Sequence, residues 1–208
     1  MECVHAKDRA APFAALVDEA AACRACPRMD GRRRLLSTAN GPLDACVLFV
    51  AEAPGRLGGE RTGVPLQSDQ TGRNFARLLA TAGIARDGVF VTNAVLCNPR
   101  DTHGRNAPPA LIEIARCQPF LRRTIDLVTA SVIVALGKVA LAALARLEAH
   151  ELALRRDVGR PIAWRGRILV PLYHPGPRAQ IHRPLPEQER DFAALAALLA
   201  SLHDGAGG

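Results

Sequence analysis

The feature that most constrains the fold is the alternation of short apolar runs with segments of helical periodicity. Four runs rich in apolar and β-branched residues indicate buried strands, at 45–51, 89–95, 132–136 and 167–172. The segments around them predict helices, at 11–23, 71–81, 109–128, 137–147 and 186–202. Strands that alternate with helices are typical of a parallel sheet covered on both faces. We therefore predict a three-layer α/β/α sandwich with a central four-stranded parallel sheet.

The length of 208 residues suits one such domain. We assign residues 1–202 to it and expect the tail, 203–208, to be disordered. Thr71 is expected to cap the helix at 71–81. Residues 161–164 are expected to form a short hairpin arm with the last strand.

Two further sequence features bear on the cellular location of the protein. No apolar run approaches the roughly 20 residues that a membrane helix needs. The first residues, MECVHAKDRA, lack the order of a signal peptide. We therefore expect a cytoplasmic protein without membrane contact.

The charge balance is strongly basic, with 27 Lys and Arg against 20 Asp and Glu and a formal net charge of +7. Lys7 and Lys138 are the only lysines, so the positive charge is almost entirely arginine. Guanidinium groups bind phosphate oxygens two at a time, which favours a phosphate-rich partner. The alternative is that a GC-rich genome has enriched arginine codons.

The cysteines indicate a metal centre. Cys23 and Cys26 form a C-x2-C pair, Cys97 follows the second strand, and Cys117 lies within the next helix. Four thiolates that converge suit an iron–sulfur cluster or a tetrahedral zinc, and the alternative is four separate core cysteines. Cys46, within the first predicted strand, is expected in the core, and Cys3 is expected to be free.

Five ordered motifs resemble one family. AEAPG at 51–55, VTNAVLC at 91–97, VIVALGKVA at 132–140 and LYHPGPR at 172–178 are similar to signatures of the iron–sulfur members of the uracil-DNA glycosylase superfamily. The fifth is the cysteine pattern, since the four cysteines fall where that family's cluster ligands fall. The loop GRLGGERTGVPLQSDQTG resembles a sister branch, so the chain is family-4-like with features of family 5.

The resemblance implies a DNA-repair enzyme of base excision, a monofunctional hydrolase that flips uracil out of DNA and leaves an abasic site. It implies a [4Fe–4S] cluster on Cys23, Cys26, Cys97 and Cys117, with zinc as the alternative metal. The implied partner is uracil-containing DNA, single- or double-stranded. We expect a monomer, associated with the bacterial nucleoid.

Three polar residues lie at the carboxyl ends of three of the predicted strands, and each suits one step of N-glycosidic hydrolysis. Glu52 is expected to orient water, as carboxylates do in glycoside hydrolysis, with Asp69 as the second candidate. His174 is expected to donate a hydrogen bond to the leaving uracil anion. Asn93 is expected to pair with the base. The alternatives are a loop salt bridge for Glu52, a helix cap for Asp69, a structural histidine and a strand-end cap for Asn93.

Two further residues are assigned to the base pocket, Ala53 in the first motif and Leu66. Leu66 stands where both branches usually have a phenylalanine that stacks on uracil. That difference keeps open a glycosylase for another deaminated base, such as hypoxanthine or xanthine.

The loop after the last strand is expected to enter DNA, because a base in the stack cannot be reached. Pro177 and Arg178 would form the wedge, and Arg183 and Arg105 would contact the backbone. His103 and His182 do not match the context of the family's nucleophilic histidine, and His103 is expected to face solvent.

Two other functions remain open. A non-catalytic, metal-bearing nucleic-acid-binding module would keep the cysteines and basic loops without needing Glu52, Asn93 and His174. A nucleotide-binding loop at 55–63 ranks last, because it lacks both G-x-G-x-x-G and the Walker lysine.

Overall fold

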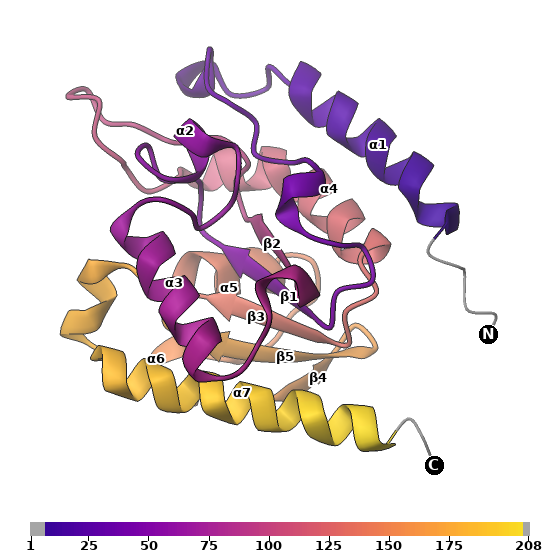
Figure 1. Cartoon of the computed structure of the whole chain (residues 1–208). Helices are drawn as coiled ribbons and strands as arrows, with labels where there is room; N and C mark the ends of the chain where they lie inside the picture. The colour runs from indigo at the N-terminus through magenta and orange to yellow at the C-terminus, as the bar shows by residue number, and fades with distance from the viewer. Residues whose placement is uncertain (1–6, 206–208) are drawn as a thin grey trace.

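The sheet has five strands in the order β2-β1-β3-β5-β4 (Figure 1). The computed structural model describes residues 7–205. Four strands are parallel: β1 (Val47–Ala51), β2 (Val89–Asn93), β3 (Val132–Leu136) and β5 (Arg167–Leu172). β4 (Ile162–Trp164) pairs antiparallel with β5. The predicted parallel core and hairpin arm are therefore confirmed, and the arm makes the sheet one strand wider than four.

Helices cover both faces of the sheet (Figure 1). One face packs against α1 (Lys7–Ala22), α4 (Leu111–Leu127) and α5 (Lys138–Ala145). The other packs against α3 (Gln70–Thr81) and α7 (Leu185–Gly205). Successive residues of a strand point to opposite faces, so Leu48 and Val50 join the first core and Val47 and Phe49 the second. The three-layer prediction is therefore confirmed.

The connections contain short elements that the sequence pattern did not predict. α2 (Gly59–Thr62) lies in the loop after β1, and α6 (Leu154–Asp157) precedes β4. Residues 7–205 also contain four 3-10 helices: η1 (Pro27–Met29), η2 (Thr38–Asn40), η3 (Arg86–Gly88) and η4 (Pro177–Ile181).

Four predictions about helix ends and cysteines need correction or comment. Thr71 does not cap α3, because Asp69 is the N-cap and accepts a hydrogen bond from the Gly72 amide at 2.8 Å. α7 continues to Gly205, beyond the predicted end at 202. Cys46 is exposed rather than in the core, because it precedes β1 and its thiol donates to the Gly88 carbonyl oxygen at 3.0 Å. Cys3 lies outside the described residues.

The parallel strands place their carboxyl ends at one edge of the sheet. The loops that follow β1, β2, β3 and β5 therefore meet there, which is where open α/β sheets bind ligands. Between residues 7 and 205, no helix combines the length and apolar character needed to span a membrane.

Candidate functional site

Asn93 and Glu52 emerge side by side at this edge of the sheet. Asn93 ends β2 and pairs in register with Ala51, the residue before Glu52. The Val95 amide donates to the Glu52 carbonyl oxygen at 3.1 Å, which keeps the two loops together beyond the strands. Asn93 is only 3% exposed, and its Nδ2 atom has no hydrogen-bond partner among the described residues. Because an unpaired buried amide is costly, Asn93 is available to a ligand.

Glu52 is partly buried at the end of β1. Desolvation raises the pKa of this carboxyl group above its usual value, and the positive charge of Lys138 partly opposes that rise. Lys138 begins α5, so the loop after β3 also contributes a charge to the site.

His174 follows β5 by two residues and is held in one tautomer. The Gly176 amide donates to its Nδ1 at 3.1 Å, so in the neutral ring the proton is assigned to Nε2. Desolvation lowers the pKa of His174 to about 4, and Asp69 acts in the opposite direction. Near neutral pH the ring is therefore uncharged, with an Nε2–H available as a donor.

The backbone around His174 is shaped to admit the ring. A Cβ at Gly176 would lie 2.9 Å from Nδ1, so a side chain there would displace the imidazole. Asn74, buried on α3, donates from Nδ2 to the Pro175 carbonyl oxygen at 2.7 Å and fixes the loop from the other side. Asn74 was not predicted as a site residue, because its only signal in the sequence is a polar residue on the buried face of an amphipathic helix.

Asp69 is a helix cap that also lies close to the loop after β1. A Cβ at Gly55 or Gly58 would come within 2.7 or 2.4 Å of its Oδ2. These two glycines therefore allow the loop to pass over the carboxylate. Asp69 is the N-cap of α3, which was the alternative expected for it. A catalytic role for Asp69 stays a prediction.

A second buried asparagine joins the loops after β1 and β2. Asn98 is 1% exposed and donates from Nδ2 to the Pro54 carbonyl oxygen at 2.6 Å and to Asn106 Oδ1 at 3.0 Å. Arg100 pairs with Glu60 at 2.5 Å across the same two loops. This network was not predicted, because its only signal in the sequence is an asparagine between Cys97 and a proline.

Ala53 and Leu66 pack against the cores on opposite faces of the sheet. Ala53 packs against the core that includes α1, α4 and α5, and Leu66 packs against the core that includes α3 and α7. Leu66 has a φ of 50°, an uncommon backbone conformation for a residue with a side chain. Their places in a base pocket stay predictions.

The predicted DNA contacts differ in how free their side chains are. Pro177 and Arg178 are exposed on η4, and no hydrogen bond or ion pair in the described structure involves the Arg178 side chain. Arg183 instead pairs with Asp191 at 2.5 Å and with Glu187 at 2.9 Å. Arg105 pairs with Asp101 at 3.0 Å but remains largely exposed. These contacts with DNA stay predictions.

Two histidines outside the strand ends are exposed. His103 lies in the loop before α4, where its backbone amide donates to Asp101 Oδ1 at 2.9 Å. His182 follows η4.

The four cysteines from three segments lie near one another. Burial raises the pKa of Cys97 to about 11 and that of Cys117 to about 12, and the charges of Cys23 and Cys26 act on both in the same direction. The Leu96 amide donates to the Cys117 sulfur at 3.4 Å. Within residues 7–205, no three His, Cys, Asp or Glu side chains stand close enough to bind a metal as they are placed. Thiolates are nevertheless the donors that suit an iron–sulfur cluster or zinc, and the charges of Cys23 and Cys26 act on both Cys97 and Cys117.

Arg34 lies beside this cysteine cluster. Its Nε and one Nη donate to the Cys23 carbonyl oxygen at 3.1 and 2.6 Å. Its charge also lowers the pKa of Cys97, against the larger effect of burial. A guanidinium in this position would offset part of the negative charge of a thiolate cluster.

Comparison with known proteins identifies the family. The sequence profile "Uracil DNA glycosylase superfamily" matches residues 38–200. The chain is 33% identical over 154 residues to the type-4 uracil-DNA glycosylase of Thermotoga maritima, covering 74% of this chain and 76% of that protein. It is 28% identical over 197 residues to the type-4 enzyme of Sulfurisphaera tokodaii, covering 87% of this chain and 82% of that one. It is 30% identical over 150 residues to the type-5 uracil-DNA glycosylase of Pyrobaculum aerophilum, covering 66% and 64%. Together with the fold and the residues at the strand ends, these matches show that the chain belongs to the uracil-DNA glycosylase superfamily.

Proposed function

We propose that this protein flips uracil out of DNA and hydrolyses its N-glycosidic bond, leaving an abasic site. The observation that carries the proposal is the buried, unpaired amide of Asn93 at the same sheet edge as a carboxylate, Glu52, and a neutral histidine donor, His174. Relatives named uracil-DNA glycosylase support the choice of uracil. The surroundings of Asn93, His174 and Glu52 support a separate role in this reaction for each of them.

Asn93 selects the base. A carboxamide offers one donor and one acceptor side by side, which matches O4 and N3–H of uracil. Cytosine has a donor at position 4 and an acceptor at N3, so it would meet the amide with the wrong polarity. Because Asn93 is nearly inaccessible to water, the mismatch would leave buried polar atoms unpaired.

His174 stabilises the leaving base. As the N-glycosidic bond breaks, negative charge develops on the uracil ring, and the Nε2–H of a neutral imidazole donates a hydrogen bond to O2. The Gly176 amide fixes the tautomer in advance, so no proton has to move first. Removing one such donor from a developing anion typically costs about 100- to 1000-fold in rate.

Glu52 orients the attacking water and stabilises the positive charge on the sugar. Its position at the end of β1 places the carboxylate between Asn93 on β2 and Lys138 after β3. Lys138 favours the charged form of the carboxyl group that this task requires. Asp69 contributes through its charge on His174.

The cysteine cluster would hold a [4Fe–4S] centre through Cys23, Cys26, Cys97 and Cys117, with zinc as the alternative. When bound, such a centre crosslinks the segment after α1, the loop after β2 and helix α4. We assign it a structural role, because the cysteines and the residues at the strand ends form separate groups. The protein would act in the cytoplasm as a monomer on single- or double-stranded DNA.

The testing experiment incubates purified protein with labelled oligonucleotides that carry uracil, hypoxanthine or xanthine at one position. Alkali-labile breaks at uracil are the expected product. Breaks only at hypoxanthine or xanthine would favour the second glycosylase function, which the replacement of the stacking residue by Leu66 keeps open. No break on any substrate, with DNA binding intact, would favour a non-catalytic binding module.

A further inference from the structure

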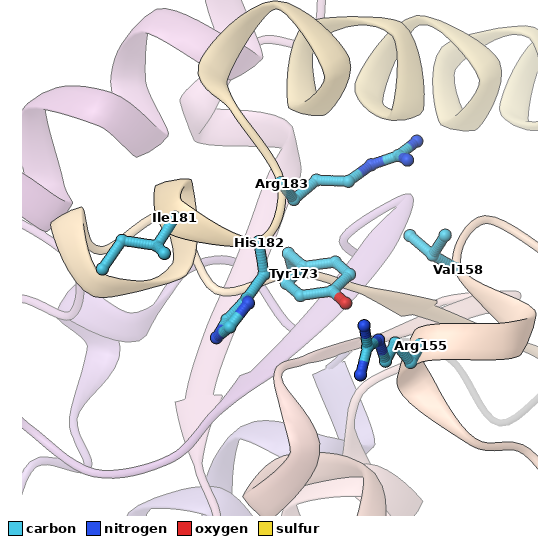
Figure 2. A pocket seen from close by; sticks show the side chains of 6 residues that line it. All are labelled: Arg155, Val158, Tyr173, Ile181, His182 and Arg183. Carbon is cyan, nitrogen blue, oxygen red and sulfur yellow. The ribbon is translucent and has the colours of Figure 1, made fainter.

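A polar cavity of about 350 Å³ lies beyond the carboxyl end of β5, on the far side of the His174 loop. Figure 2 shows the residues that line it, which come from α6, the end of β5, η4 and the start of α7: Arg155, Val158, Tyr173, Ile181, His182 and Arg183. None of these residues takes part in the arrangement of Asn93, Glu52 and His174. The cavity is therefore a separate feature of the same edge of the molecule.

Three polar side chains of the cavity have unused hydrogen-bonding capacity. The Tyr173 hydroxyl points toward the Arg155 side chain, and the His182 ring lies beside the Tyr173 ring (Figure 2). In the described part of the chain, none of these three side chains has a hydrogen-bond or ion-pair partner, although Arg155 alone carries five N–H donors. A set of free donors without a free carboxylate calls for a ligand made of acceptors.

The charged residues of the cavity also favour a ligand made of hydrogen-bond acceptors. Arg183 is paired with two carboxylates, Asp191 and Glu187, so its guanidinium is not free for a ligand. Among the residues that line the cavity, Arg155 is the charged donor without an ion-pair partner in the described structure. The ligand is therefore an anion rich in acceptor oxygens, which describes a phosphate group.

The cavity is close to the place where DNA would bend around the active site. Tyr173 and His174 are consecutive, yet His174 lies against Gly137 and Gly176 while Tyr173 faces α6 and η4. A strand whose nucleotide enters on the His174 side would cross η4 and bring a neighbouring phosphate to the Tyr173 side. Ile181, which is 80% exposed on η4, would then face the sugar between them.

We infer that this cavity, defined by Arg155, Tyr173 and His182, binds a DNA backbone phosphate next to the flipped nucleotide. The inference rests on the proposed function, because it presumes that DNA is the substrate. It adds Arg155 and Tyr173 to the DNA contacts, although neither lies in a motif that predicts one.

The test measures affinity for a duplex that contains a tetrahydrofuran abasic analogue, which the protein cannot cleave. Arg155→Gln should lower affinity about tenfold, the value of one charged hydrogen bond. It should also reduce the slope of log affinity against log salt by about 0.9, the value of one phosphate contact. Tyr173→Phe should weaken binding less and leave the slope unchanged, because it removes a neutral donor. Arg122→Gln, an exposed arginine on α4, is the matched control and should change neither quantity.

A second arm identifies the phosphate. Uncharged methylphosphonate linkages are placed singly along the strand around the abasic analogue. One position should weaken binding by the wild type but not by Arg155→Gln. Equal effects on both proteins at every position would overturn the inference, as would an unchanged salt slope in Arg155→Gln. Weaker binding of inorganic phosphate with all DNA measurements unchanged would also overturn it, since the cavity would then take free phosphate. These outcomes are independent of uracil excision, whose absence in the wild type would refute the proposed function instead.

Discussion

Arg28 and Glu113 form a bidentate ion pair that joins two of the segments carrying cysteines. Arg28 Nε and Nη2 donate to the two carboxylate oxygens at 2.8 and 2.5 Å. Arg28 lies two residues after Cys26, and Glu113 lies one turn before Cys117 on α4. Glu113 is 4% exposed and also accepts a hydrogen bond from the Ala110 amide at 2.7 Å, so a single carboxylate orders the helix start and the C-x2-C segment.

Arg28→Ala should therefore destabilise the protein strongly, because it leaves the buried Glu113 without its partner. Breaking a buried ion pair in this way typically lowers the free energy of unfolding by about 3–5 kcal/mol. Because Arg28 is itself half-exposed, we expect a loss of about 3 kcal/mol or less. Urea unfolding measures it, together with metal content. Arg123→Ala breaks the exposed pair with Glu19 and is the control, with an expected loss of at most about 1 kcal/mol. Equal losses in the two variants would contradict this account of the pair.

Single cysteine substitutions should distinguish the proposed metal ligands from Cys46, which is not expected to bind the metal. Cys97→Ser and Cys117→Ser should lose bound metal, because each removes one of the four proposed thiolate ligands, whereas the exposed Cys46→Ser should keep it. A [4Fe–4S] protein should be brown, with a broad absorbance near roughly 400 nm. Colourless protein with stoichiometric zinc would exclude the iron cluster, and metal retained in Cys97→Ser would exclude the ligand set.

The lowered pKa of His174 predicts how stability depends on pH. The ring has a pKa of about 4 in the folded protein and about 6.5 when unfolded, so the unfolded chain takes up the proton first as the pH falls. The free energy of unfolding should therefore decrease as the pH falls from about 6.5 to about 4. His174→Asn should show a smaller decrease over that window, measured by urea unfolding at several pH values. The same decrease in both proteins would mean that His174 is not the buried neutral group.

Asn93→Asp should reduce uracil excision more than binding to undamaged duplex. The carboxylate keeps the size of the side chain but replaces its donor with an acceptor, which faces the acceptor O4 of uracil. A mismatched buried polar pair costs about 1–3 kcal/mol, or about 5- to 150-fold in kcat/KM. Steady-state excision and filter binding measure the two effects. If excision and undamaged-duplex binding fall together, Asn93 has a structural role only.

Leu66→Phe tests whether Leu66 faces the base. An aromatic ring there would add stacking worth about 0.5–1.5 kcal/mol, so KM for a uracil substrate should fall by a few-fold. Leu57→Phe is the control, because Leu57 is an exposed residue of the same loop. An unchanged KM in Leu66→Phe, with the fold intact by circular dichroism, would place the base elsewhere.

The sequence predicted the layers and the strand ends because both follow from short-range periodicity. β3 and β5 begin and end where the apolar runs do, and Glu52, Asn93 and His174 lie at the carboxyl ends of three parallel strands as expected. Helix α6 was missed because four residues are too few to show a period. The sequence could not distinguish Thr71 from Asp69 as the cap of α3, because both residue types suit the position.

The interactions that order the site could not be predicted in the same way. Asn98 with Pro54, Asn74 with Pro175 and Arg28 with Glu113 join residues 44, 101 and 85 positions apart. Such contacts depend on how two loops meet after the sheet has formed, which no local pattern records. The cavity beside Tyr173 depends likewise on η4 and α6, whose positions follow from packing.

We expect a neutral His174 just after β5 to stabilise the uracil anion as it leaves DNA. The rate of single-turnover excision from a uracil-containing oligonucleotide, with protein in excess, measures this stabilisation. The wild type should release uracil, and His174→Ala should do so about 100- to 1000-fold more slowly while it still binds DNA. Excision by His174→Ala at the wild-type rate would contradict the account.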